Sequence, residues 1–212
     1  MPNMVVLISG SGSNLQRLID TQDEHGMKIS LVISNRADAY GLQRAKQHGI
    51  NSKVLSHKDY SDRSTYDQAL AQLIKSEQPD LVVLAGFMRI LTPELVNQFL
   101  GRMINIHPSL LPKYPGLNTH ARALEAGDEH HGCTVHFVIP KLDAGPNIAQ
   151  ARLRILASDN ANSLQQRVHQ LEHQLYPQVV AWFAQDKLQM NAEQSWLDGQ
   201  PLKPQGRVFD YS

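Results

Sequence analysis

Met4-Val5-Val6-Leu7-Ile8-Ser9-Gly10-Ser11-Gly12-Ser13-Asn14-Leu15 lies near the start of the chain and decides its fold. The apolar run Met4 to Ser9 predicts a buried strand, and the amphipathic segment 13–21 predicts a helix. The glycines and serines between them predict a tight connection from strand to helix. Backbone amides and the positive end of a helix dipole at such a connection attract a phosphate.

The same alternation continues through the first half of the chain. Apolar runs that predict strands are followed by amphipathic runs that predict helices, which is typical of a mostly parallel, twisted sheet with helices on both faces. The expected strands are 4–9, 29–34, 53–55, 80–85 and 103–107, and the expected helices are 13–21, 41–47, 62–76 and 93–99.

The second half has a different pattern. Segments 133–139 and 147–155 predict two strands that pair as a hairpin-like, antiparallel element. The long amphipathic run 163–187 predicts one helix, and the tail to Ser212 is polar with little pattern. No linker or repeat interrupts the chain, so a single domain over 1–212 is expected.

Composition limits the classes of function. The 212 residues are 42% apolar, and 20 basic residues balance 20 acidic ones, so no broad basic surface for nucleic acid is expected. Small-molecule substrates fit better. The apolar run near the amino terminus is too short for a membrane span or a signal peptide. With Cys133 as the only cysteine, no intrachain disulfide is possible, and a cytoplasmic protein is expected.

The loop 9–15 does not match the better-known phosphate motifs. It lacks the Gly-Lys-Ser/Thr ending of a P-loop. It also has Leu15 where a dinucleotide fingerprint has its third glycine. A cradle for a single phosphate remains. The alternative is a tight turn in which Ser13 or Asn14 caps the helix.

Asn105 and His107 predict a catalytic centre. The period of two in a strand places both side chains on one face, and Pro108 ends the pairing. A carboxamide and an imidazole there can stabilise an oxyanion. Asp143, in Leu-Asp-Ala-Gly-Pro at 142–146, can orient the imidazole and favour its charged form if it lies nearby. The alternatives are polar groups at a strand end and an ordinary turn aspartate.

A metal site is the main competing interpretation. The stretch 169–173 reads His-Gln-Leu-Glu-His and matches a zinc pattern on a predicted helix, which allows a zinc hydrolase built on His169 and His173. No third ligand is evident, so no metal is expected. Of the other histidines, the pair at 130–131 is expected at the surface, whereas His136 is expected as a buried partner of the site.

Four separated segments resemble the family of folate-dependent glycinamide ribonucleotide formyltransferases. They are Ser-Gly-Ser-Gly-Ser-Asn-Leu at 9–15, Leu-Ala-Gly-Phe-Met-Arg-Ile-Leu at 84–91, Ile-Asn-Ile-His-Pro-Ser-Leu-Leu-Pro-Lys-Tyr-Pro-Gly at 104–116 and Leu-Asp-Ala-Gly-Pro at 142–146. The resemblance also includes Gln-Leu-Glu-His at 170–173. It implies a Rossmann-like formyltransferase fold, with nucleotide phosphate bound by the amino-terminal half and folate by the carboxyl-terminal half.

The resemblance implies a role for each matching position. Asn105, His107 and Asp143 correspond to the catalytic residues. The implied ribonucleotide contacts are Gly12, Ser13, Asn14, His169, Gln170, Leu171 and Glu172. The implied folate contacts are Arg63, Met88, Arg89, Ile90, Leu91, Asn105, Ile139, Pro140, Lys141, Leu142 and Asp143. Family members often have glycine where Ala144 stands and histidine where Asn118 stands, so the folate loop is expected to differ in detail.

The implied reaction is formyl transfer from 10-formyltetrahydrofolate to the amine of 5'-phosphoribosylglycinamide, in purine biosynthesis. It yields formylglycinamide ribonucleotide and tetrahydrofolate by direct attack, without a metal or an acyl-enzyme. A formyltetrahydrofolate hydrolase and a methionyl-tRNA formyltransferase share the catalytic residues but carry further domains. A noncatalytic nucleotide-binding module is a further alternative. The oligomeric state is left as monomer or homodimer.

Overall fold

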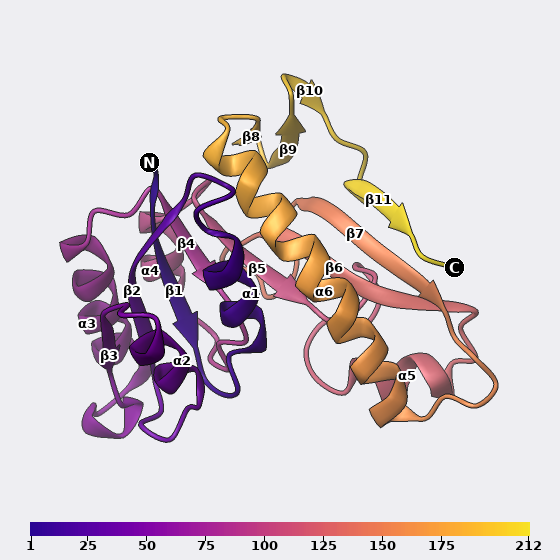
Figure 1. The fold of residues 1–212 in the computed structure, drawn as a ribbon, viewed down its shortest axis with the longest axis horizontal. Helices are drawn as coiled ribbons and strands as arrows, with labels where there is room; N and C mark the ends of the chain where they lie inside the picture. The colour runs from indigo at the N-terminus through magenta and orange to yellow at the C-terminus, as the bar shows by residue number, and fades with distance from the viewer. The chain divides into compact units, whose positions relative to one another are not determined.

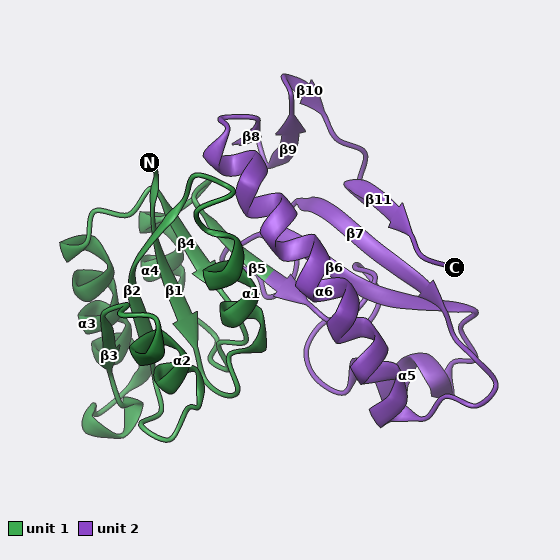
Figure 2. Cartoon of the chain, in the orientation of Figure 1, with its two compact units in different colours: residues 1–105 green, residues 106–212 purple.

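The computed structural model describes residues 1–212 and contains two compact units, residues 1–105 and 106–212 (Figures 1 and 2). Each unit has its own sheet strands and helices. The organisation of the chain as a single domain stays a prediction.

The first unit alternates strands with helices, as the sequence predicts. Its strands are β1 (Asn3–Ile8), β2 (Lys28–Ser34), β3 (Ser52–Val54), β4 (Leu81–Leu84) and the start of β5 (Met103–His107). Its helices are α1 (Ser13–Thr21), α2 (Gly41–Gln47), the 3₁₀ turn η1 (His57–Asp59), α3 (Arg63–Ser76) and α4 (Pro93–Gln98).

The strands of this unit form a parallel sheet in the order β3-β2-β1-β4-β5. Helix α1 contacts α2, and α3 contacts α4. Figure 1 draws α1 and α2 in front of the sheet and α4 behind it, as right-handed crossovers running in both directions from β1 require. Helices therefore cover both faces, which is why 4–8 and 81–84 are buried at every position. The predicted fold class is confirmed.

The second unit contains α5 (Thr119–Glu125), β6 (His130–Phe137), β7 (Asn147–Arg154), α6 (Ala161–Ala184), β8 (Leu188–Asn191), β9 (Gln194–Leu197), β10 (Gln200–Pro201) and β11 (Arg207–Asp210). Strands β6 and β7 are antiparallel, which confirms the predicted hairpin-like element. Helix α6 packs against both strands and against α5. Its first turn carries a capping box made by Asn160 and Ser163, so the helix begins two residues earlier than predicted.

The tail contains more structure than its pattern indicates. Strands β8, β9 and β10 form a separate antiparallel sheet, and β11 adds to β7 in parallel. Phe209 on β11 stacks with Trp182 of α6 at 6.3 Å between ring centroids. These strands are two to four residues long, which is too short for a hydrophobic period to be recognised in the sequence.

Candidate active site

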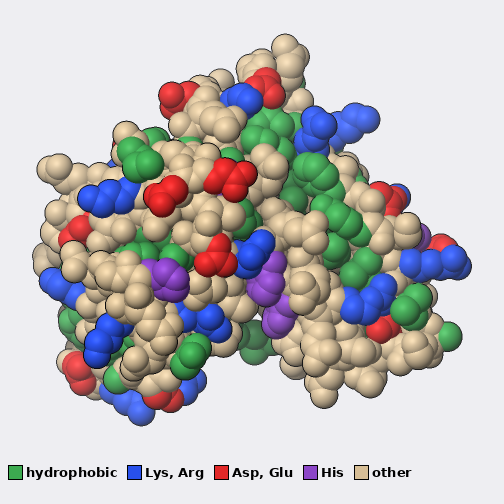
Figure 3. Space-filling model, viewed as in Figure 1, with side chains coloured by type: hydrophobic (Ala, Val, Ile, Leu, Met, Phe, Trp, Pro, Cys, Tyr) green, Lys and Arg blue, Asp and Glu red, His purple; other side chains and the backbone are tan.

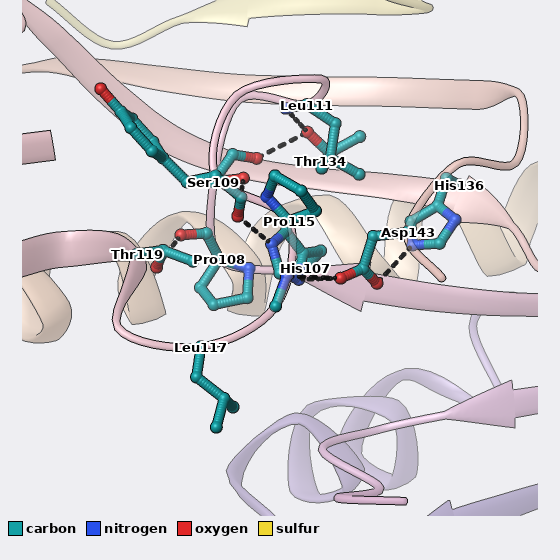
Figure 4. Close-up of polar contacts among 12 residues, drawn as sticks. His107, Pro108, Ser109, Leu111, Pro115, Leu117, Thr119, Thr134, His136 and Asp143 are labelled. Carbon is teal, nitrogen blue, oxygen red and sulfur yellow. Dashed lines mark hydrogen bonds and ion pairs between the residues drawn. The ribbon is translucent and has the colours of Figure 1, made fainter. Parts of the chain in front are cut away.

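His107 is the last residue of β5, and its imidazole is buried between two partners (Figure 4). Its Nε2 lies 2.8 Å from the carbonyl oxygen of Tyr114, and its Nδ1 lies 3.5 Å from Oδ2 of Asp143. Because a carbonyl can only accept, Nε2 carries the proton in that contact. The expected juxtaposition of His107 with Asp143 is therefore present.

Asp143 is placed by an unusual backbone conformation. Its φ is 48°, in the left-handed region that aspartate tolerates better than most residues. Its Oδ2 accepts a hydrogen bond from the backbone N–H of Gly116 at 2.9 Å. Ala144 is not among the residues with positive φ, so alanine there imposes no strain. The position that needs left-handed backbone is Asp143 itself.

Gly145 makes the close approach that this loop requires. A Cβ atom on Gly145 would lie 1.8 Å from the carbonyl oxygen of Phe137, at the end of β6. Backbone cannot move out of the way as a flexible side chain can. Glycine at this position therefore allows the loop that carries Asp143 to lie against β6.

His136 lies on the other side of Asp143, as the sequence predicts. Its Nε2 is 3.8 Å from Oδ1 of Asp143, and its Nδ1 is 2.9 Å from the carbonyl oxygen of Phe137. Burial lowers the pKa of His136, and this effect outweighs the attraction of Asp143. At neutral pH the ring is therefore uncharged.

The segment after His107 is held by polar groups that sequence reasoning missed. Thr134 on β6 donates to the carbonyl of Ser109 at 2.7 Å and accepts from the N–H of Leu111 at 3.1 Å. Ser109 donates to the carbonyl of Lys113 at 2.6 Å. These bonds fix the turn that presents the Tyr114 carbonyl to His107. The partners are mostly main-chain groups, which carry no residue-type signal.

Asn105 stands two residues before His107 on β5 and is half-buried. Alternation along the strand places both side chains on one face, as expected. The strand predicted at 103–107 has the predicted bounds.

The loop 9–15 of the first unit makes a tight connection from β1 to α1. Gly12 has φ 68° and precedes α1 without a side-chain cap, so the predicted alternative of a Ser13 or Asn14 cap is wrong. A Cβ on Gly12 would lie 2.6 Å from the Cα of Gly41. Arg44 of α2 donates to the carbonyl of Ser11 at 2.9 Å, and this hydrogen bond ties the loop to α2.

The proposed folate contacts divide between the units. Arg63 and the segment 88–91 belong to the first unit, where Met88 and Ile90 are exposed and Leu91 is buried. The end of β1 is tied to this segment, because Ser9 Oγ accepts from the N–H of Met88 at 2.8 Å. The segment 139–143 belongs to the second unit and ends in Asp143.

The segment 169–172 lies on α6 in the second unit. Glu172 is buried. Burial of Cys133 and Tyr176 raises the pKa values of these two groups, and the charge of Glu172 raises them further. The rings of His169 and His173 stack at 6.3 Å. The structure contains no group of three or more His, Cys, Asp or Glu side chains arranged to hold a metal.

Of the pair at 130–131, expected at the surface, His130 is half-buried and His131 is buried. His131 is 1% exposed, and its Nε2 lies 3.1 Å from Nδ1 of His120 on α5. Burial lowers the pKa of both His120 and His131 to about 4. His131 is buried because α6 packs against β6 and His120 of α5 contacts its ring, and the neighbouring sequence gives no sign of that cover.

The parallel sheet, with its glycine loop after β1 and a polar pair at the end of β5, defines a Rossmann-like α/β protein. A family model described as formyl transferase matches residues 2–180, and the chain belongs to that family. The chain is 51% identical to phosphoribosylglycinamide formyltransferase of Escherichia coli (strain K12), over 98% of this chain and 99% of the relative.

Two further relatives match most of this chain. A solved structure of phosphoribosylglycinamide formyltransferase from Coxiella burnetii, in complex with CHES, superposes with a TM-score of 0.95. It is 51% identical and covers 98% of this chain and 99% of its own. The human trifunctional purine biosynthetic protein adenosine-3 is 42% identical over 92% of this chain, which corresponds to 20% of that larger protein. No helix of the structure has the length and apolar character needed to cross a membrane.

Proposed function

We propose that this chain transfers the formyl group of 10-formyltetrahydrofolate to the amine of 5'-phosphoribosylglycinamide. The observation that carries this proposal is the buried contact between His107 and Asp143. His107 lies two residues after Asn105 on β5. The high identity to named formyltransferases over almost the whole chain supports the choice of substrates.

The proposed reaction begins with attack of the amine on the formyl carbon. The formyl oxygen becomes an oxyanion, and the Asn105 carboxamide and the His107 imidazolium stabilise it. Because Nε2 of His107 already donates to the Tyr114 carbonyl, the N–H that serves the oxyanion is the one on Nδ1. The carbon–nitrogen bond to the folate then breaks, and the folate nitrogen takes up a proton.

Asp143 would place a negative charge beside the His107 ring and help to orient it. His136, kept neutral by burial, adds no second cation beside the carboxylate. Asp143 would also help a water molecule carry the proton from the attacking amine to the departing nitrogen. Burial raises the pKa of Cys133 well above its usual value, so a thiolate nucleophile is not required.

The binding residues are proposed from the resemblance and from their surroundings. Gly12, Ser13 and Asn14 would bind the ribonucleotide phosphate, and 169–172 would contact the remainder of that substrate. Arg63, 88–91 and 139–143 would contact the folate. The exposed side chains of Met88 and Ile90 suit a flat, aromatic pterin. We also propose that the protein acts in the cytoplasm, without a metal, as a monomer or homodimer.

The test mixes the purified protein with phosphoribosylglycinamide and the formyl donor and follows release of tetrahydrofolate. Release should require the ribonucleotide and should persist after treatment with a chelator. Release at an equal rate without the ribonucleotide would favour the hydrolase alternative. Loss of activity on chelation, with stoichiometric metal in the untreated protein, would favour a zinc hydrolase built on His169 and His173.

A further inference from the structure

The segment 88–92 carries four of the proposed donor contacts, and hydrogen bonds fix it at both ends. At its start, the N–H of Met88 donates to Ser9 Oγ at 2.8 Å. At its end, the N–H of Thr92 donates to Oδ2 of Asp67 at 2.6 Å. Thr92 then caps α4 by accepting from the N–H of Leu95. The backbone of this segment is therefore held before any ligand binds.

Between these two ends, Arg89 lies on an aromatic ring. Its Cζ is 4.6 Å from the centroid of the Tyr66 ring, which belongs to α3. The ring is fully buried, and Tyr60 packs against it edge-on at 5.5 Å. A desolvated guanidinium over an aromatic face is stabilised more than an exposed one. Tyr66 is therefore a rigid platform for Arg89.

The hydroxyl of Tyr66 does not explain why a tyrosine occupies this position. Its Oη is buried and makes no hydrogen bond, and burial raises the pKa of Tyr66 to about 12. Nε of Arg89 is likewise buried without a hydrogen-bond partner. The orientation of the guanidinium thus depends on the ring face and on the nearby carboxylate of Asp67, which Arg89 affects electrostatically.

We propose that Tyr66 is a positioning residue for the formyl donor: its ring holds Arg89 in the orientation in which the segment 88–91 receives that substrate. The inference rests on the proposed function, because it assigns Arg89 to donor binding. It adds a residue of the α3 core that has no contact with the donor. Its effect should appear in the KM for the donor and not in the chemical step.

The first test compares Tyr66→Leu with Tyr66→Phe in steady-state formyl transfer. Tyr66→Leu removes the aromatic face and should raise the donor KM about 3- to 10-fold, with kcat and the ribonucleotide KM close to wild type. Tyr66→Phe keeps the ring and loses only the unbonded hydroxyl, so its donor KM should match wild type. In an Arg89→Ala background, Tyr66→Leu should add no further rise.

A donor KM raised equally by Tyr66→Phe and Tyr66→Leu would overturn the proposal, as would additive effects of Tyr66→Leu and Arg89→Ala. A second measurement requires neither a variant nor activity. The NMR signal of the Arg89 Nε–H in the wild-type protein should be shifted upfield by the ring current of Tyr66. An unshifted signal would overturn the platform itself, whereas a shifted signal with no formyl transfer would overturn only the proposed function.

Discussion

Both ring nitrogens of His107 face a partner in the structure. Nε2 donates to the Tyr114 carbonyl, and Nδ1 faces Asp143 at 3.5 Å, longer than an ordinary hydrogen bond. A contact of this length is a charge interaction more than a hydrogen bond, so it does not saturate the N–H on Nδ1. We therefore expect the proposed reaction to depend on the charge of Asp143 more than on a tight hydrogen bond.

Asp143→Asn tests that dependence. The amide oxygen can still accept from the N–H of Gly116, so the loop should keep its conformation. The negative charge beside His107 is lost. We expect kcat to fall by about 10²–10³, similar to the loss of an oxyanion-stabilising donor, with little change in thermal unfolding. Turnover near the wild-type rate in the folded variant would rule out this role for Asp143.

The buried contact between His120 and His131 predicts a pH dependence of stability. Burial lowers the pKa of each ring from 6.5 to about 4, so the unfolded chain binds protons before the folded protein does. Stability from these rings is fully present above pH 6.5. It should decrease as the pH falls toward 4 and change no further below that.

Urea unfolding at a series of pH values measures this effect. His131→Gln removes one of the two titrating rings, so its free energy of unfolding should fall less steeply between pH 6.5 and 4 than that of the wild type. The comparison uses the slopes, since the substitution also changes packing at every pH. Parallel slopes for the two proteins would contradict the assignment.

At the scale of elements, the loop between β6 and β7 decides where Asp143 lies. Gly145 approaches the Phe137 carbonyl so closely that a side chain would overlap it. Gly145→Ala should therefore displace the loop and lower kcat at least about 10²-fold, because the charge beside His107 moves away.

Ala144→Gly is the matched control for that change. Residue 144 has no positive φ and so gains nothing from glycine. Its kcat should stay near the wild-type value, with at most about 1 kcal/mol less stability from added backbone freedom. Equal losses at 144 and 145 would mean that general loop flexibility, and not the approach to Phe137, controls the site.

Much of this element level could be predicted from the sequence. The strands of the first unit are continuous apolar runs, and the bounds of β5 were predicted without error because Pro108 ends the pairing. The start of β6 was missed by three residues, since His130 and His131 look polar although His131 is buried. Main-chain partners such as the Tyr114 carbonyl have no sequence signature at all.

At the scale of the whole molecule, the formal charges balance. Twenty basic and twenty acidic residues cancel, and the face in Figure 3 shows Lys, Arg, Asp and Glu side chains interspersed. A surface of this kind gives no broad electrostatic attraction for nucleic acid. It is consistent with small substrates, which are recognised by a few specific polar groups.

Some features of the whole molecule could not be predicted from the sequence pattern. The balance of charge and the alternation of strands and helices predicted the fold class and excluded a basic surface. The short strands of the tail were not predicted, because β8 to β11 are stabilised by contacts with distant residues, such as Phe209 on Trp182. The identity of the two substrates also depended on a resemblance to known enzymes and not on periodicity.

The most direct measurement follows a labelled formyl group from 10-formyltetrahydrofolate by mass spectrometry, with wild-type protein and His107→Ala. We predict that the label appears in formylglycinamide ribonucleotide, and that His107→Ala forms this product about 10²–10³ times more slowly while it still binds both substrates. Label released as free formate at a rate independent of the ribonucleotide, or product formed by His107→Ala at the wild-type rate, would contradict the account.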